Sequence, residues 1–240
     1  MAKVPASYRV RILTTTPLAT SAGLTRLFDT LAELGLTPTH QGADERAREP
    51  FDRETLVAAI SARPHAFALA RRKAPTYSAS ISAQPAGELG AIQLDFPGSQ
   101  DASAVFAVGD RLAEVFRAEH GLVHPTFEGE GQFNSASVLE AGRLQQYGLK
   151  APGARTWYGP HLRALVGEAR FASAGGVLRE TAWGALCLDL VADPESARFT
   201  TLARRQREAF AALSPSGAFG DYSHPVIKKP GPRWRPIPVA

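Results

Sequence analysis

Two stretches of this 240-residue chain repeat one pattern, and the repeat narrows the architectures open to the sequence. GAIQLDFPGSQDASAVF, at 90–106, and GALCLDLVADPESARF, at 184–199, both begin with Gly-Ala and alternate apolar residues up to Leu-Asp. Each then passes a turn and continues into apolar residues at helical spacing. Alternation is typical of a strand, and recurrence every three or four residues is typical of a helix. The repeat therefore predicts, in each half of the chain, a strand that leads into a helix.

The remaining segments favour an antiparallel sheet. YRVRILT at 8–14, HAFALA at 65–70 and TYSASISA at 76–83 alternate as half-buried strands do. Helices are predicted from Thr20 or Ser21 to Gly35, after the capping residue Asp52, from Ser99 to Gly121, over about 136–147, and over 195–214. Between the last two we expect a loop-bounded strand and helix at 155–167 and two strands at 176–190.

This order predicts an α+β fold, with an antiparallel-rich sheet and helices mainly on one face, built from two related, ferredoxin-like strand–helix halves. We expect an N-terminal half at 1–130 and a C-terminal half at 131–240 that ends in an extended tail rich in Pro and Gly; one continuous domain is the alternative. With 44% hydrophobic and 21% charged residues, the chain can bury a sizeable core. It has no apolar run long enough to span a bilayer and no leader pattern, which predicts a cytoplasmic protein.

Asp95 and Asp189 occupy the same place in the two repeats. Two carboxylates that meet in space can perform acid–base chemistry or hold a metal ion. An aspartate before a helix also caps the free amides of its first turn. We favour capping or surface solvation for both residues.

Histidines and the single cysteine give little evidence of catalysis. His120 and His124 have the spacing of zinc ligands on a helix, but Gly121 between them is expected to end the helix. Cys187 alternates with leucines and is predicted to be a packed, unreactive thiol. The sequence has no nucleophile elbow, phosphate-binding loop or dinucleotide fingerprint, so we predict no cofactor, no metal and no catalytic residues. A small metal-dependent hydrolase is the least favoured alternative.

Basic and aromatic residues point to two kinds of partner. The net charge is +4, and arginines and lysines cluster in a predicted helix and in the tail: Arg204, Arg205, Arg207, Lys228 and Lys229. Such clusters can bind nucleic acid, although the solvated side of a helix carries the same residues. Tyr, Trp and Arg dominate protein–protein interfaces. The tail therefore offers a candidate protein-binding surface at Tyr222, Arg233, Trp234 and Arg235.

The second half resembles a bacterial group of proteins. RLQQYGL at 143–149, RTWYGPHLRALVG at 155–167, ETAWGALCLDLVADP at 180–194, SGAFGDYSHP at 216–225 and GPRW at 231–234 resemble the predicted immunity proteins of polymorphic and type VI toxin systems. The resemblance implies a cytoplasmic, non-catalytic protein that binds a cognate toxin and blocks it. It supplies no catalytic residues. Inhibitors of nucleases commonly present acidic surface, so a basic chain implies either a local acidic patch, at 119–130 or 44–54, or a toxin with an acidic face.

Overall fold

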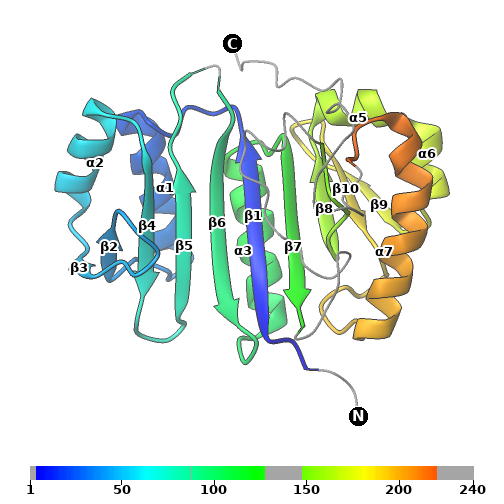
Figure 1. Cartoon of the computed structure of the whole chain (residues 1–240), viewed down its shortest axis with the longest axis horizontal. Helices are drawn as coiled ribbons and strands as arrows, with labels where there is room; N and C mark the ends of the chain where they lie inside the picture. The colour runs from blue at the N-terminus through cyan, green and yellow to red at the C-terminus, as the bar shows by residue number, and fades with distance from the viewer. Residues whose placement is uncertain (1–3, 87, 128–147, 221–240) are drawn as a thin grey trace.

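The computed structural model describes residues 4–86, 88–127 and 148–220, and it contains a ten-stranded sheet (Figure 1). The strand order is β3-β2-β4-β5-β6-β1-β7-β8-β10-β9, and every paired strand runs antiparallel to its neighbour. The strands are β1 Ser7–Thr14, β2 His40–Gly42, β3 Glu49–Pro50, β4 Ala66–Arg71, β5 Tyr77–Ser82, β6 Gly90–Pro97, β7 His120–Thr126, β8 Arg155–Tyr158, β9 Val177–Glu180 and β10 Leu186–Asp189. The α+β class with a large antiparallel sheet is confirmed.

Helices follow the strands in the order that the repeat predicts. They are α1 Ser21–Glu33, α2 Arg53–Ala62, α3 Ala102–Val115, α5 Pro160–Val166, α6 Glu168–Ser173 and α7 Phe199–Leu213, and a short 3-10 turn follows at Ser214–Ser216. Thr20 caps α1 and Asp52 caps α2, as expected, because each side chain accepts a hydrogen bond from an amide of the first turn. The predicted helix at 136–147 lies outside the described residues.

The two halves share one topology and join at β7. In the first half, β1 lies beside β6, and β6 leads into α3; in the second, β8 lies beside β10, and β10 precedes α7. Both β1 and β8 pair with β7, and both run antiparallel to it. The halves are therefore related by an approximate two-fold axis along β7, and the sheet is continuous through that strand.

A two-fold axis along a strand exchanges the two faces of the sheet. The helices of the two halves are therefore expected to lie on opposite faces. Gly109 of α3 lies so close to Val123 and Trp157 that any side chain there would overlap them, so α3 covers the face on which these two residues lie. Tyr158, the next residue along β8, points to the opposite face, where its ring lies 4.9 Å from that of Phe171 in α6. Figure 1 shows α1 and α3 behind the strands and α7 in front, at the right. Within each half the helices lie on one face, but the two halves use opposite faces.

The third helix was predicted to end at Gly121, but it ends earlier, and Gly121 belongs to the next strand. The helix α3 ends at Val115, Arg117 takes a left-handed φ of 45°, and Gly121 lies inside β7. Gly121 is needed for packing rather than for a turn: a Cβ there would lie 2.9 Å from Ile12 Cδ1 and 3.1 Å from Trp157 Cε3. The glycine therefore makes room for the indole ring between α3 and the sheet.

Buried apolar side chains from both halves form one connected core. Trp157 is 2% exposed and packs in this core, and Trp183 is partly buried at its margin. The continuous core and sheet give the polar residues described below a fixed scaffold.

Candidate functional site

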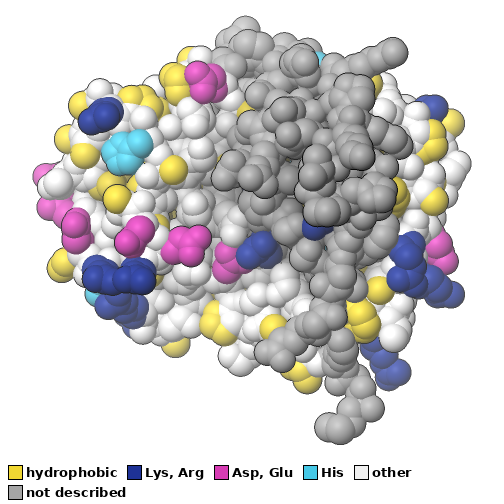
Figure 2. All heavy atoms as spheres, in the orientation of Figure 1, with side chains coloured by type: hydrophobic (Ala, Val, Ile, Leu, Met, Phe, Trp, Pro, Cys, Tyr) yellow, Lys and Arg dark blue, Asp and Glu magenta, His cyan; other side chains and the backbone are white. Residues whose placement is uncertain are grey.

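The face of β4, β5, β6 and β1 that points away from α1–α3 carries the most regular polar surface among the described residues; we call it the polar face. Alternation brings small side chains to it from two strands: Ala66, Ala68 and Ala70 from β4, and Ser78, Ser80 and Ser82 from β5. Ser78 and Ser80 are exposed. Figure 2 shows this side of the molecule.

A row of charged and amide groups borders these small residues. Arg9 Nε donates to Asp95 Oδ1 at 2.6 Å, and Gln93 Nε2 donates to Asp95 Oδ2 at 2.6 Å. The side chains of Arg9 and Asp95 are 24% and 25% exposed. Asp95 thus has a partner on each oxygen, so it is held in one position and is poorly suited to abstract a proton.

A shallow hollow of about 330 Å³ lies at the end of this row. Ser7, Thr76, Ser78 and Asp95 contribute polar groups to it, and Tyr77, Phe96 and Pro97 complete its walls. The described residues that line the hollow supply hydroxyl groups and a carboxylate paired with an arginine, and none of them is a histidine, cysteine or lysine. Its chemistry suits recognition by hydrogen bonds rather than nucleophilic or acid–base catalysis.

The second repeat carries the same cross-strand pair on the other face. Asp189 lies opposite Arg155 as Asp95 lies opposite Arg9. Arg155 donates to both oxygens of Asp189, at 2.7 and 3.1 Å, and its side chain is 11% exposed. Arg179 adds a third bond to Asp189 at 3.1 Å. The repeated Leu-Asp therefore encodes an Arg–Asp bridge between neighbouring strands in each half.

The second bridge extends into α3. Arg155 Nη1 lies 2.8 Å from Asp110 Oδ2, and its guanidinium lies 5.2 Å from the centre of the Phe106 ring. Burial raises the pKa of Asp110, against the opposing effect of Arg155. This cluster connects the two halves through charge and packing, and its carboxylates are all engaged.

Asp95 and Asp189 do not form a shared site. They lie four strands apart, roughly 19 Å at the usual strand spacing, and on opposite faces of the sheet. Capping is wrong for both residues: Asp101 caps α3, and α7 begins after Arg198 without a side-chain cap. Surface solvation is wrong for Asp189, which is 6% exposed, whereas Asp95 is 25% exposed; both aspartates pair with arginines. The arginines come from distant strands, so sequence spacing gave no sign of these pairs.

His120 and His124 lie on β7, not on a helix, and both are buried. Their side chains project from the same face of the strand, with Cα atoms roughly 13 Å apart at the usual rise per residue. Burial, with a smaller effect of Arg11, lowers the pKa of His120 to about 3, so its ring is neutral. Within the described ranges, no group of three or more His, Cys, Asp or Glu side chains is placed to hold a metal ion.

Cys187 is fully buried on β10, and burial raises the pKa of its thiol to about 12. Arg179 Nη2 lies 3.3 Å from its sulfur. The thiol is therefore protonated at neutral pH and packed, as the alternation of the strand predicts.

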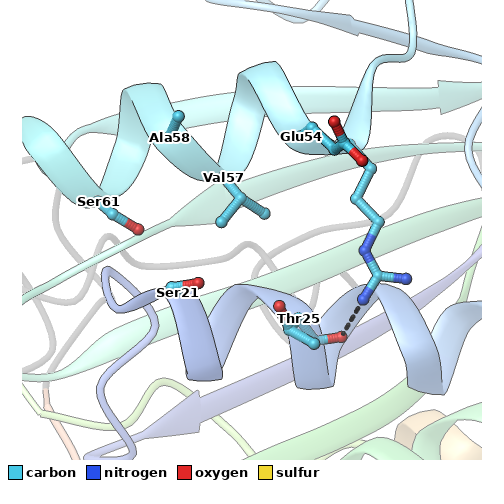
Figure 3. Close-up of a pocket in the computed structure, with 7 residues that line it drawn as sticks. Ser21, Thr25, Glu54, Val57, Ala58 and Ser61 are labelled. Atoms are coloured by element: carbon cyan, nitrogen blue, oxygen red, sulfur yellow. Dashed lines mark hydrogen bonds between the residues drawn. The ribbon is translucent and has the colours of Figure 1, made fainter.

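The groove between α1 and α2 is a second concave surface, of about 370 Å³ (Figure 3). Val57 and Ala58 form its apolar part, while Ser21, Thr25 and Ser61 point hydroxyl groups toward it. Arg53 closes one end and is held by Asp29 at 2.7 Å and by the Thr25 carbonyl at 3.4 Å. Its lining offers one carboxylate, Glu54, without a histidine or cysteine beside it.

The arginines proposed for nucleic-acid binding are not equivalent. Arg204 and Arg207 are exposed on α7. Arg205 is not part of a solvated face: it donates to the carbonyl groups of Leu190 and Gly175 and pairs with Glu208 at 3.0 Å. It fixes α7 to the end of the sheet. The other residues singled out in the tail lie outside the described residues: Tyr222, Lys228, Lys229, Arg233, Trp234 and Arg235.

No protein-family model and no curated protein matches the sequence. Among solved structures, the chain is similar to the Pseudomonas aeruginosa T6SS protein PA0821, with a TM-score of 0.57 and 13% sequence identity. The similarity covers 93% of this chain and 79% of that chain. At this identity the similarity concerns the fold, and it extends over both halves of the sheet. None of the helices among the described residues is long and apolar enough to cross a membrane.

Proposed function

We propose that this chain is a non-catalytic, cytoplasmic protein-binding module of the immunity type, which neutralises a cognate protein toxin by binding to it. The observation that carries the proposal is the similarity of fold, across nearly the whole chain, to a protein of a type VI secretion system. The resemblance of the second half to predicted immunity proteins of such systems, through RTWYGPHLRALVG and ETAWGALCLDLVADP, supports the same assignment.

The polar face is the surface that we assign to the toxin. Its alanines and serines lose little or no side-chain entropy when a partner covers them, so docking there costs less than docking on long side chains. Arg9, Gln93 and Asp95 are already fixed by their mutual hydrogen bonds. A preorganised surface of this kind favours tight binding over a modest area.

The engaged carboxylates support binding rather than catalysis. Asp95 and Asp189 each accept two or more hydrogen bonds from neighbouring side chains. A general base needs a free lone pair directed at the substrate. The described aspartates that the repeat singles out therefore act as structural ion pairs.

A protection assay tests the proposal. A candidate toxin is chosen from the genes that neighbour this one and is expressed in a bacterial host with and without the chain, and growth is measured. We expect the wild-type chain to restore growth, and a Ser80→Arg variant, which places a long charged side chain on the polar face, to restore it less. A Ser61→Arg variant in the groove between α1 and α2 is the matched control. Failure of soluble wild-type chain to protect the host would reject the immunity role.

A further inference from the structure

Five cations gather where β2, β3 and β4 meet, and we call this group the basic edge: Arg46, Arg48, Arg71, Arg72 and Lys73. All but Arg71, which is half-buried, are exposed. Figure 2 shows dark-blue side chains gathered at the lower left, over the end of the sheet that carries β2 and β3. The two segments that supply them are at least 23 residues apart in the chain and are brought together by the sheet.

Two of these guanidinium groups are held in place without being neutralised. Arg72 Nη2 donates to the carbonyls of Arg46 and Ala47, at 3.5 and 3.2 Å. Arg71 donates to the carbonyls of Thr37 and Ala74, at 2.8 and 3.3 Å. Carbonyl groups fix the position of a cation but leave its full charge uncompensated. The basic edge is thus built to hold positive charge in defined positions.

The arginines elsewhere on the sheet and helices differ in this respect. Most are paired with carboxylates at 2.6–3.2 Å: Arg9, Arg53, Arg111, Arg155, Arg163, Arg179 and Arg205. Within the part of the chain that the structure describes, no cation of the basic edge has a carboxylate within ion-pair distance. The five cations outnumber the three carboxylates of the same segment, Asp44, Glu45 and Glu49, so this end of the sheet carries an excess of positive charge.

The basic edge continues the polar face. Ala70, on that face, pairs with Ser78, and Arg72 is the first residue after the end of β4. The amide of Arg72 is fixed by Thr39 Oγ1 at 3.0 Å. A partner seated on the serines of β5 therefore extends naturally over Arg72 and its neighbours.

We propose that the basic edge docks an acidic segment of the partner protein, next to the part of the partner that covers the polar face. This inference rests on the proposed function and specifies the partner's chemistry. Asp44, Glu45 and Glu49 lie among the cations in the same segment. A continuous phosphate backbone would be repelled by these carboxylates, whereas a protein surface can place its own charges of either sign to match. The mixed pattern favours a protein over nucleic acid.

The test uses the purified full chain and two fluorescein-labelled probes, a poly-glutamate peptide and a DNA duplex of similar charge. The variant Arg46→Glu, Arg48→Glu, Lys73→Glu reverses three exposed side chains and leaves Arg71 and Arg72, which hold the loops, intact. The control Arg198→Glu, Arg204→Glu, Arg207→Glu changes the net charge equally on α7. A second variant with Gln at the three basic-edge positions removes the charges more mildly.

We expect the peptide to bind the wild-type chain and the α7 control with affinities within about threefold of each other. The basic-edge variant should bind the peptide at least about tenfold more weakly than the wild type. This difference should shrink as the salt concentration rises. The Gln variant is expected to lie between them. Equal losses in the basic-edge and α7 variants, or no peptide binding by the wild type, would overturn the inference. Tighter binding of the DNA probe through the same three residues would overturn the choice of a protein partner.

The growth assay separates this inference from the proposed function. If the wild type protects the host and the basic-edge variant protects equally well, the inference is wrong and the immunity role stands. If the wild type does not protect but the peptide result holds, the immunity role is wrong while the acidic-segment site stands.

Discussion

Asp95 and Asp189 occupy equivalent places in the repeat but differ in burial, and we expect them to contribute differently to the free energy of unfolding. Asp189 is 6% exposed and bonds to Arg155 and Arg179, whereas Asp95 is 25% exposed. We expect Asp189→Asn to lower the free energy of unfolding by about 3–5 kcal/mol, because the buried Arg155 guanidinium loses the carboxylate that accepts two of its hydrogen bonds and keeps only its bond to Asp110. The matched change Asp95→Asn should cost under about 1 kcal/mol. Urea unfolding of the two variants checks this; equal losses would contradict the assigned burial.

His120 makes stability depend on pH. Burial lowers its pKa in the folded chain to about 3, and the ordinary value in an unfolded chain is about 6.5. The unfolded state therefore binds the extra proton first, and stability that is present at pH 7 is lost as the pH falls from about 6.5 toward 3. Between pH 7 and pH 5 this loss amounts to about 2 kcal/mol. We expect His120→Gln to flatten the curve over that interval, and His65→Gln, an exposed control, to leave it unchanged.

For single residues, the sequence identified the positions of the key polar side chains but not the contacts that these side chains make. Asp95, Asp189 and His120 were all identified from pattern and spacing. Their partners were not, because Arg9 lies 86 residues from Asp95 and Arg155 lies 34 residues from Asp189. Only the register of the paired strands decides which side chains become neighbours. The basic edge was missed for the same reason, because Arg46 and Arg48 come near Arg71, Arg72 and Lys73 only through the sheet.

Among the elements, α7 offers a direct test of which arginine faces the protein. Arg205 bonds to the carbonyls of Leu190 and Gly175, and Arg207, one half-turn away, is exposed. We expect Arg205→Ala to cost about 1–2 kcal/mol of unfolding free energy, since it leaves two carbonyls without their donor. Arg207→Ala should stay within about 0.5 kcal/mol. Thermal unfolding distinguishes them, and a larger effect at Arg207 would reverse the assigned orientation of the helix.

Most helices and strands were predictable because their signals are local. Capping at Thr20 and Asp52 and the positive φ of Gly35 and Gly167 follow from side-chain chemistry within a few residues. The end of α3 was not predictable in this way. Gly121 looks like a helix terminator in sequence, but it lies in β7 because the Trp157 ring, supplied by another strand, occupies the space of a side chain. Tertiary packing, not turn geometry, determines that position.

On the scale of the molecule, the sheet passes from one half to the other through β7 without a break. Trp157 of β8 packs against Gly109 of α3, so the cores of the halves are joined as well. We expect a single cooperative unfolding transition, with the midpoint measured by tryptophan fluorescence, which reports on the second half, equal to that measured by far-UV circular dichroism. Two separate midpoints would show that the halves unfold independently.

The two-fold relation of the halves also explains why the sequence did not predict which face of the sheet the helices of each half cover. A strand–helix repeat specifies that each helix folds back over its own strands. It does not specify whether the second copy lies on the same face as the first, which depends on how the copies join. Here both β1 and β8 pair with β7, and this arrangement reverses the faces. One consequence is that β4, β5, β6 and β1 keep a face that the described helices leave uncovered.

The polar face, which the described helices leave uncovered, and the adjoining basic edge are the basis of the proposed role in toxin binding. Isothermal titration of the purified chain with a purified candidate toxin, chosen from the genes that neighbour its own, tests this role most directly. The account predicts a saturable one-to-one complex that is weakened by Ser80→Arg and by reversal of charge at Arg46, Arg48 and Lys73, but not by reversal on α7. Absence of binding by the folded wild-type chain, or a complex that all of these variants form equally well, would contradict it.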